Sequence, residues 1–579
     1  MKKTFRGWRF GLGLALAAAG SAAAAQAAVY YVASGNSLAA DANPGTQSLP
    51  WLTLQHAADT VSAGDEVVVL PGDYARPTLR RGGAAGAPII FRGQNPPDRS
   101  LMNPDAVLDP ASPVPVPGNP AANAVVHGVS IRANFIHVRN LEVTAITGRG
   151  GISVQDCQDV EISGNFIHDL NPGLYDYGGV RGENHRTYLV RVLNNVLYHV
   201  QGTGIGLMGQ GWLVEGNEVS HGTDIRTDTG EDTGGDVDAV RFFGGNHVIR
   251  GNYLHHYLNT ECAGSPHMDA FQTFSVYPDS QFAYNIVVEG NRCEYFGQMF
   301  MCEDQAEQSG GENSVHDITF RNNLFRGARA YSIIISDYTD HFSFINNVVS
   351  ESWYGPLSVS DHGHHITVLN NIFYRNGQSA WSTAQGRNGG AQLNDPTCIE
   401  GSLWDYNLYY PDFTWPLKNP DFDRHSRFGP DPQFADAAAS DFHLTAGSPA
   451  VDAGSPWGNF NYDLEGHFRP HGPAWDLGAY EYNSHYAPPP ADIALIPVMT
   501  YPNPGRDRVH FRFDPRTPAA VSVDIFNPAG ERVGKLAGFV DPDWRNLDCD
   551  ARGWPAGVYL YRVIQNGKPG ATGKFALRP

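Results

Sequence analysis

Short runs of alternating hydrophobic and polar residues recur along the middle of the chain, and many of them end at an asparagine. The asparagine is the centre of nine triplets such as Gly164-Asn165-Phe166 and Asn194-Asn195-Val196. The spacings between successive centres are 25, 30, 22, 35, 39, 32, 24 and 24 residues. A minimum near 22 to 25 residues with longer exceptions is typical of a solenoid in which some coils carry insertions.

Asparagine suits a solenoid corner because it tolerates left-handed backbone angles and because stacked amides can form hydrogen bonds from coil to coil. Asn-Gly and Asn-Asn pairs also occur at ordinary hairpin turns. Most of the triplets follow a short β-prone run such as Val160-Glu161-Ile162. We therefore predict a solenoid of short parallel strands.

A second family of strands precedes the asparagines, and two of its members are nearly the same sequence. Asp238-Ala239-Val240-Arg241 and Asp269-Ala270-Phe271-Gln272 would lie on neighbouring coils, with Asp238 over Asp269 and Arg241 over Gln272. Because side chains alternate along a strand, Val240 and Phe271 are expected to face inward while Arg241 and Gln272 face outward.

The beginning of the chain predicts a cap for this solenoid. Residues 52–61 have helical periodicity, and a mostly apolar strand, Glu66 to Leu70, follows them. The order of Tyr30-Tyr31-Val32, Asn43-Pro44-Gly45-Thr46 and Pro71-Gly72-Asp73-Tyr74 resembles the opening of secreted proteins of the pectate-lyase-like superfamily. That resemblance implies an all-β chain whose main part is a right-handed parallel β-helix with an N-terminal helical cap, and it implies a polysaccharide as partner.

We divide the chain into five parts. Residues 1–27 have the basic start, short apolar core and small-residue end of a secretory signal peptide. Residues 28–385 are the expected β-helix, residues 386–482 a C-terminal capping region, and residues 483–495 a linker that contains Pro488-Pro489-Pro490.

The last part, residues 496–579, has the alternation and turn spacing of a small β-sandwich. Its motifs, among them Tyr501-Pro502-Asn503-Pro504 and Gly557-Val558-Tyr559-Leu560, resemble immunoglobulin-like modules related to the flagellar hook-capping protein and to type IX secretion sorting domains. The resemblance implies that this module engages secretion machinery or attaches the protein to the cell surface, without chemistry of its own.

The composition of the chain limits the classes of binding partner and the location that we expect. The formal net charge is −20, which argues against nucleic acid as the main partner. The apolar core of the leader is too short to span a membrane and no other run is long enough, so we expect a secreted or cell-surface protein without a transmembrane segment. Six cysteines fit an oxidising compartment; a disulfide and buried single thiols both remain open.

The candidate site surrounds the two related strands. We predict Asp238, Arg241, His267 and Asp269 as catalytic residues and Gln272, Glu303 and Asp304 as substrate-binding residues. The preceding acidic loop offers hard oxygen ligands for a calcium cofactor. These predicted metal ligands are Asp224, Asp228, Glu231, Asp232 and Asp236.

Two reactions fit a groove on stacked coils. A polysaccharide lyase removes the proton next to a uronate carboxylate, and a cation stabilises the charge that develops. The lysine that serves as base in some β-helix lyases is missing, since Lys418 is the only lysine between residues 29 and 490. The base would then be Arg241 or His267. A glycoside hydrolase would use two carboxyl groups, which Asp238, Asp269, Glu303 and Asp304 could supply.

Other interpretations stay open beside this one. The acidic loop also fits a solvated insertion, and His267 also fits a turn cap. His362, His364 and His365 form either a metal site or an exposed polar turn. A noncatalytic glycan-binding or adhesin-like β-helix is a further alternative, because a fold does not fix a function.

Overall fold

The structure is a computed structural model. It describes residues 27–100, 117–144, 150–170, 178–224, 236–262, 265–275, 281–304, 314–360, 363–377, 392–393, 401–412, 423–457, 460, 462–483, 498–501, 505–506, 508–513, 519–540, 546–565 and 568–578.

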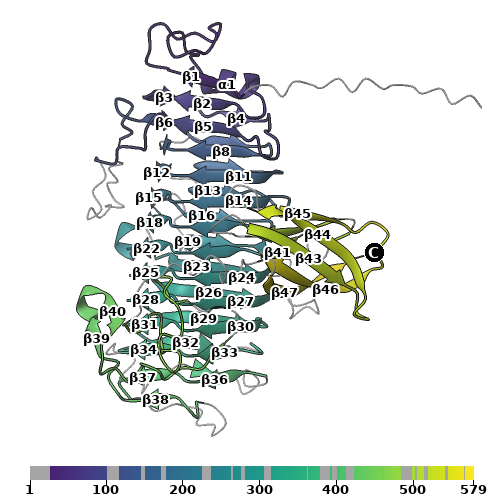
Figure 1. Ribbon diagram of the computed structural model, residues 1–579. Coiled ribbons are helices and arrows are strands. Elements are labelled where there is room, and N and C mark those ends of the chain that lie inside the picture. Colours follow the sequence, from purple (N-terminus) through teal and green to yellow (C-terminus); the bar gives the residue numbers. More distant parts are fainter. Residues whose placement is uncertain are drawn as a thin grey trace, which may run out of the picture.

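Three long parallel sheets form the body of the molecule, and each coil of the chain contributes a strand to each sheet (Figure 1). Sheet A contains β1 (Val29–Val32), β2 (Glu66–Val69), β5 (Ile89–Gly93), β8 (Ile136–Arg139), β11 (Gln158–Ser163), β14 (Tyr188–Leu193), β17 (Leu213–Glu215), β20 (Gly244–Gly245), β21 (Val248–Arg250), β24 (Ala283–Glu289), β27 (Val315–Arg321), β30 (Asp340–Ile345), β33 (Thr367–Leu369) and β36 (Leu403–Asp405).

Sheet B contains β3 (Gly72–Tyr74), β6 (Ala124–Val126), β9 (Glu142–Val143), β12 (Phe166–Leu170), β15 (Val196–Val200), β18 (Glu218–Ser220), β22 (Tyr253–His255), β25 (Arg292–Glu294), β28 (Leu324–Arg326), β31 (Val348–Ser350), β34 (Ile372–Tyr374), β37 (Leu408–Tyr410) and β38 (Arg427–Phe428). Sheet C contains β4 (Thr78–Leu79), β7 (Val129–Ile131), β10 (Ile152–Val154), β13 (Val180–Gly182), β16 (Ile205–Leu207), β19 (Asp236–Phe242), β23 (His267–Ser275), β26 (Gln298–Asp304), β29 (Tyr331–Asp337), β32 (Gly355–Val359) and β35 (Gln392–Leu393). The fold is a right-handed parallel β-helix, as predicted.

A ladder of asparagine side chains runs through the corner between sheets A and B. From Asn165 to Asn371, each Nδ2 donates to the Oδ1 of the asparagine on the next coil at 2.9 to 3.1 Å, and Asn407 Nδ2 donates to Asp423 Oδ1 at 3.2 Å. Each Nδ2 also donates to a backbone carbonyl, as Asn217 does to Val192. We call this row the asparagine ladder, and its members are Asn165, Asn195, Asn217, Asn252, Asn291, Asn323, Asn347, Asn371 and Asn407.

The coil-to-coil amide bonds were predicted, but the left-handed backbone belongs to the residue before each ladder asparagine. Asn194 and Asn346 have φ of 54° and 53°, and glycine takes the same place at Gly216. Asn140 also has this left-handed conformation, so the ladder position on its coil belongs to Leu141, whose N–H donates to Asn165 Oδ1. The first of the nine triplets therefore lies one residue out of register.

The helix α1 (Leu54–Thr60) covers the first coil, as predicted. Its buried face, with Leu54, Ala57 and Ala58, belongs to the same hydrophobic core as the first strands. The Thr53 hydroxyl accepts a hydrogen bond from the N–H of His56 and caps the helix. A short apolar helix thus closes the end of a core that a solenoid would otherwise expose.

The coils continue beyond the predicted boundary at residue 385. Strands β36 and β37 pair with β33 and β34 in the same parallel register, and Asn407 extends the asparagine ladder. The expected end of the β-helix is therefore corrected by at least one coil. An insertion lengthens the spacing from Asn371 to Asn407 to 36 residues, which hides this repeat in the sequence.

The following segment packs along the side of the solenoid. Residues of β40 (Asp441–Leu444) and Leu477 pack on Leu324, Val348 and Ile372, which point outward from sheet B. The 3₁₀ turn η4 (Ala437–Ala439) connects β40 to the hairpin strand β39 (Phe434–Asp436). Another 3₁₀ turn, η1 (Asn259–Glu261), follows β22. We expected this segment to cover the open end. It packs on an apolar outer face of sheet B, and this contact removes exposed hydrophobic surface from water.

Side chains from the solenoid hold this returning segment. Asn346 Nδ2 donates to the carbonyl of Asp476, and Asn370 Nδ2 donates to that of Ser455. Within the segment, Arg469 and Glu481 form a buried ion pair at 2.8 Å. These contacts give the polar residues of the closing segment structural roles.

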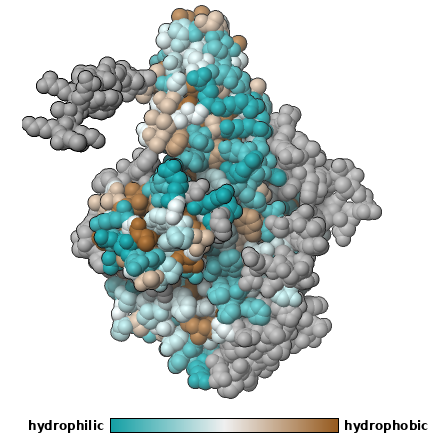
Figure 2. Space-filling model, turned by 90° about the vertical axis from the view of Figure 1, so that its right-hand side faces the viewer, coloured by the Kyte–Doolittle hydropathy of each residue, from teal (hydrophilic) through white to brown (hydrophobic). Residues whose placement is uncertain are grey.

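The C-terminal module is a β-sandwich with a hydrophobic core of its own. One sheet has β41 (Val498–Tyr501), β42 (Arg508–Phe513) and β45 (Asn546–Asp550), and the other has β43 (Ala519–Phe526), β44 (Arg532–Val540), β46 (Gly557–Gln565) and β47 (Lys568–Leu577). Figure 2 shows the side of the molecule that carries this module, where the described surface is mostly hydrophilic.

Two further expectations concern cysteines and membranes. The five described cysteines are all buried free thiols, so none of them forms a disulfide; Cys398 lies outside the described residues. The predicted signal peptide lies outside them as well, apart from Ala27. Within the part of the chain that the structure describes, no helix is both long and apolar enough to cross a membrane.

Candidate functional site

The two related strands lie side by side in the predicted register. Asp238 pairs with Asp269 and Arg241 with Gln272 on β19 and β23 of sheet C. Asp236 pairs with His267 at the start of the same strands. Residues about thirty positions apart in the sequence therefore share one patch, as the stacking argument requires.

Strand alternation is interrupted between Asp238 and Arg241. Ala239 and Val240 are consecutive, yet both are fully buried in the hydrophobic core. Two inward residues in a row place Asp238 and Arg241, three positions apart, where their side chains meet. Arg241 Nε donates to Asp238 Oδ2 at 2.6 Å, a short charge-assisted hydrogen bond.

Asp236 links the arginine to the predicted histidine. Its carboxylate lies 3.3 Å from Arg241 Nη2 and 3.7 Å from His267 Nδ1. The His267 side chain is 65% exposed, whereas Asp238 and Asp269 are fully buried. His267 is therefore the member of the group that solvent reaches most easily.

Asp269 occupies an environment that opposes its charge. Burial raises its pKa well above the ordinary value, and the neighbouring Asp238 and Asp236 raise it further. Gln272 Nε2 donates to its Oδ2 at 3.3 Å. The direction of this shift favours the neutral form of Asp269 beside Asp238.

A pocket of about 170 Å³ opens beside Arg241 on the outer face of sheet C. Arg181 pairs with Gly206, and Gly206 pairs with Arg241, so the two arginines flank a glycine in one row across three coils. Both arginines line the pocket, together with Phe243 and Phe274. Because Gly206 has no side chain, there is room between the two arginines for an anionic group.

The remaining predicted substrate residues lie away from this pocket. Gln272 is 4% exposed and faces Asp269. Glu303 is half-buried on β26, in register with Phe274. Asp304 is fully buried and accepts hydrogen bonds from the N–H groups of Ser314 and Val315. Among the described residues, neither Glu303 nor Asp304 lines the pocket.

The predicted calcium ligands are only partly described. Asp228, Glu231 and Asp232 lie outside the described residues. Asp224 is buried, and Asp236 faces Arg241 and His267. No group of three metal-ligating side chains within the described ranges includes Asp224 or Asp236. These two carboxylates alone do not form a calcium cage, because calcium takes six to eight oxygen ligands.

The predicted histidine cluster near residue 364 has different members. His365 Nδ1 lies 2.7 Å from Asp340 Oδ1, and the His365 ring stacks on His341. His362 lies outside the described residues, and His364 is not part of this group. The group of Asp340, His341 and His365 is largely exposed.

Sequence reasoning missed Arg181 and a buried set of histidines. Arg181 follows from the strand spacing, since Val180-Arg181-Gly182 lies midway between the strands at residues 152 and 205. The histidines follow from the asparagine ladder: His199, His221 and His256 each stand four residues after a ladder asparagine.

The geometry defines a right-handed parallel β-helix with a pocket beside two arginines, and sequence comparison defines its C-terminal module. Residues 499–577 match the family described as "Secretion system C-terminal sorting domain", which confirms the predicted resemblance to type IX sorting domains. The protein is secreted or displayed at the cell surface. No curated protein matches the chain.

Three solved structures illustrate the similarity of the fold. Pectate lyase Pel9A shares 15% identity and a TM-score of 0.45, with 79% of this chain and 96% of that chain covered. XylC in complex with xylose shares 11% identity and a TM-score of 0.43, over 79% and 99%. A rhamnogalacturonan lyase shares 12% and 0.38, over 72% and 96%. At these values the similarity transfers neither a substrate nor a residue role.

Proposed function

We propose that this protein is a polysaccharide-active enzyme that cleaves a uronate-containing glycan by elimination. The observation that carries the proposal is the row Arg181, Gly206 and Arg241, which puts two guanidinium groups around one pocket on the outer face of sheet C. Guanidinium groups bind carboxylates through paired, charge-assisted hydrogen bonds. The aromatic rings of Phe243 and Phe274 add flat apolar surface against which a sugar ring packs.

In this proposal Arg241 neutralises the uronate carboxylate and thereby makes the neighbouring C5 proton more acidic. His267 accepts that proton. The electron pair of the C5–H bond forms the C4–C5 double bond, the C4–O bond breaks, and the leaving oxygen takes a proton. The products are an unsaturated uronate and a shortened chain.

Asp238 and Asp269 support this reaction without contacting the glycan. Both are fully buried, so we assign them to positioning rather than to contact with the glycan. Asp238 fixes the direction of the Arg241 guanidinium through its 2.6 Å hydrogen bond. The raised pKa of Asp269 disfavours its charged form, and a neutral Asp269 leaves the positive charge of Arg241 less compensated than two carboxylates would.

One observation favours a glycoside hydrolase as the second candidate. Asp238 and Asp269 are paired across neighbouring strands, and the raised pKa of Asp269 gives one acid beside one base. The product decides between the reactions, since only elimination gives a conjugated unsaturated uronate that absorbs ultraviolet light. A noncatalytic glycan-binding protein would retain the polymer and give neither product.

The test is a screen of the purified protein against uronate-containing and neutral glycans, followed by variants on the active polymer. Arg241→Ala should lower kcat/KM by about 10²-fold or more, as the loss of a charge-stabilising donor usually does. Arg250→Ala is the matched control, because Arg250 also binds a carboxylate and has a nearly equal exposed fraction, 10% against 9%, but lies on sheet A. Equal activity in wild type and Arg241→Ala would remove this site from consideration.

A second variant fills the pocket without removing a charge. A Cβ at Gly206 would meet no atom closer than 3.8 Å, so Gly206→Leu should fold and should block the space between the arginines. Gly35→Leu is its control, because a Cβ there also meets nothing within 4 Å. Unchanged turnover in Gly206→Leu would contradict the proposed pocket.

Calcium is tested separately from the pocket. Activity measured after chelation and after calcium is restored shows whether the acidic loop supplies a cofactor site. A calcium-dependent enzyme loses activity in chelator and regains it with the ion, whereas a calcium-independent enzyme keeps its rate.

A further inference from the structure

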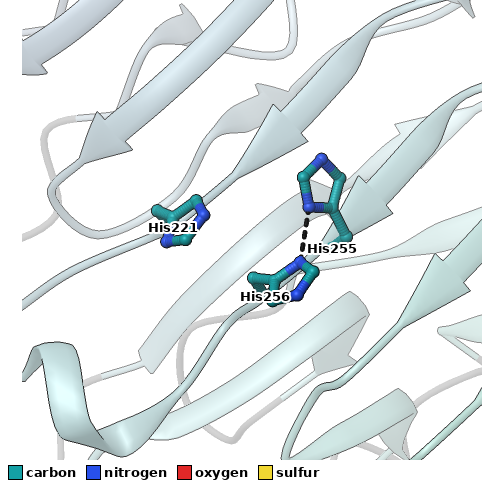
Figure 3. Close-up of side chains that lie close together, drawn as sticks. All are labelled: His221, His255 and His256. Atoms are coloured by element: carbon teal, nitrogen blue, oxygen red, sulfur yellow. Dashed lines mark hydrogen bonds between the residues drawn. The ribbon is translucent and has the colours of Figure 1, made fainter. Parts of the chain in front are cut away.

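We propose that His221, His255 and His256 form a binding site for a divalent transition-metal ion of the zinc class, with Glu261 orienting His221. One nitrogen from each of the three rings lies within 4.8 Å of the others. Figure 3 shows the three rings together, from the ends of two neighbouring coils. This site is separate from the pocket between the two arginines, and the proposal does not depend on the proposed reaction.

Stacking of the coils places these histidines at neighbouring positions. Tyr198, Ser220 and His255 are in register on β15, β18 and β22. The next residue on each coil is His199, His221 or His256, a row that we call the histidine column. Stacking of the coils, rather than closeness in sequence, brings the rings of this column together.

Each residue of the histidine column has a left-handed backbone. The φ values of His199, His221 and His256 are 49°, 55° and 56°. A side chain in this conformation costs about 1 kcal/mol or more relative to glycine. Glycine occupies the corresponding corner on a later coil, at Gly327, so the corner itself does not require an imidazole. Asp169, Tyr295, Glu351 and Arg375 take the same left-handed corner on other coils, so the conformation belongs to the corner, and what distinguishes these three successive coils is that each places a histidine there.

Three ring nitrogens in this region, two on His199 and one on His255, are buried without a hydrogen bond. His199 is 4% exposed and neither of its ring nitrogens has a hydrogen-bond partner; the nearest carboxylates, of Asp169 and Glu261, are 3.4 and 3.7 Å away. His255 Nε2 is buried without a hydrogen bond as well. Buried polar atoms are normally paired, so this cluster has capacity for a ligand.

The contact between His255 and His256 also fits two side chains that bind one metal ion. Their Nδ1 atoms face each other at 2.7 Å, where one ring must carry a proton and the other must not. Two nitrogens bound to one tetrahedral zinc ion would be about 3.3 Å apart. A small opening of the pair therefore admits a metal, and the metal removes the need for a shared proton.

A carboxylate supports the third ligand. His221 Nδ1 lies 2.9 Å from Glu261 Oε1, and Glu261 is completely buried. Metal-binding histidines commonly donate their second ring N–H to a carboxylate in this manner, which fixes the ring and raises its basicity. Glu261 and the nearby Asp169 also supply negative charge that a divalent cation would balance.

The donor atoms select the class of metal. Imidazole nitrogen suits zinc, cobalt, nickel and copper, whereas calcium and magnesium prefer oxygen. Three protein ligands leave a fourth position for water.

The experiment measures metal binding by the full-length protein, without reference to activity. The protein is stripped with a chelator and titrated with Co²⁺, whose ligand-field absorption reports nitrogen ligation, and bound Co²⁺ is then displaced with Zn²⁺. We expect one equivalent to bind. His256→Asn should weaken Co²⁺ binding at least tenfold, and because asparagine tolerates the left-handed backbone, this variant should keep its fold.

His365→Asn is the matched control. His365 also has a left-handed backbone, with φ of 51°, and belongs to the exposed group with Asp340 and His341. It should leave Co²⁺ binding unchanged. His255→Gln provides a second variant if His256→Asn fails to fold. The proposal is overturned if wild type binds no stoichiometric Co²⁺, if both cluster variants bind as tightly as wild type, or if only His365→Asn abolishes binding.

Discussion

The asparagine ladder and the histidine column stand four residues apart on the same coils, yet they treat buried polar atoms in opposite ways. Asn217 donates to Asn252 and to the carbonyl of Val192, and its oxygen accepts from Asn195. His199, on the coil that carries Asn195, forms no hydrogen bond with either ring nitrogen. The amides of the ladder are satisfied by hydrogen bonds within the fold, whereas the histidine column contains ring nitrogens without a hydrogen bond.

The difference separates polar residues that build the solenoid from those that the solenoid presents. Each ladder asparagine satisfies the next, so burying the amides costs little once the coils are stacked. In the histidine column, His199 is buried without a hydrogen bond, which is unfavourable, whereas His221 and His256 are each bonded to a neighbouring side chain. We therefore expect the two rows to respond differently to substitution.

The largest effect is expected from breaking the ladder. Asn217→Ala leaves the carbonyl of Val192 and the amides of Asn195 and Asn252 without their buried partner. The free energy of unfolding of the solenoid should fall by about 4 kcal/mol, since each unsatisfied buried group costs about 1–3 kcal/mol. Urea denaturation measures this change. Asn95→Ala, at an exposed asparagine, should change it by less than about 0.5 kcal/mol.

A histidine with hydrogen bonds at both ring nitrogens should lose stability on substitution, as the ladder asparagines do. His168 is fully buried, with Nδ1 2.8 Å from Asp169 and Nε2 2.9 Å from Glu142. His168→Gln should destabilise the protein by about 3 kcal/mol, because it leaves buried carboxylates without their partner. His316→Gln, at an exposed ion pair with Asp317, is the control in the same denaturation experiment.

The same residue makes a pH prediction. Burial opposes the charge of His168, but the hydrogen bonds to Asp169 and Glu142 prevail and raise its pKa. A raised pKa in the folded state gives stability that is fully present below about pH 6.5 and is lost as pH rises through the folded value. The deficit of His168→Gln relative to wild type should therefore shrink on going from pH 6 toward alkaline pH, and a constant deficit would contradict it.

His256 should show the opposite pH dependence. Burial lowers its pKa, and the neighbouring His255 and His221 lower it further. The unfolded chain then binds the proton more readily, so metal-free wild type loses stability as pH falls below about 6.5. His256→Asn should flatten this part of the profile by a smaller amount than His168→Gln changes it. Equal slopes in His256→Asn and wild type would show that the ring does not carry the effect.

The smallest effect is expected at His199. His199→Asn removes no hydrogen bond and keeps a residue that tolerates φ of 49°, so metal-free stability should change by less than about 1 kcal/mol. Thermal unfolding of the chelated protein is the measurement. A loss as large as that of Asn217→Ala would mean that the histidine column is structural, like the ladder.

The stacking of residues on neighbouring coils could be predicted from the sequence because a solenoid repeats at a recurring spacing. The asparagine spacing gave the coils, and the similarity of the strands at residues 238 and 269 gave the pairing of Asp238 with Asp269 that the structure confirms. The β-sandwich could also be predicted, because its alternation and its turns are local features. Where one local period sets the contacts, sequence reasoning was sufficient.

The failures arise where that period is interrupted. The insertion before Asn407 hid a coil, and the two inward residues Ala239 and Val240 changed which side chains meet. The histidine column was missed because its members are single residues at corners, with no pattern except their distance from the ladder. The closing segment was placed at the open end because the apolar outer face of sheet B cannot be recognised until the coils are stacked.

The sandwich and the solenoid have separate hydrophobic cores, with no residue shared between them. Neither unit therefore needs the other in order to bury its apolar side chains. Grafting the last eighty or so residues onto an unrelated cargo, or trimming them after transport, would leave both pieces folded, so evolution could exchange the export signal of such a protein independently of whatever its coils bind.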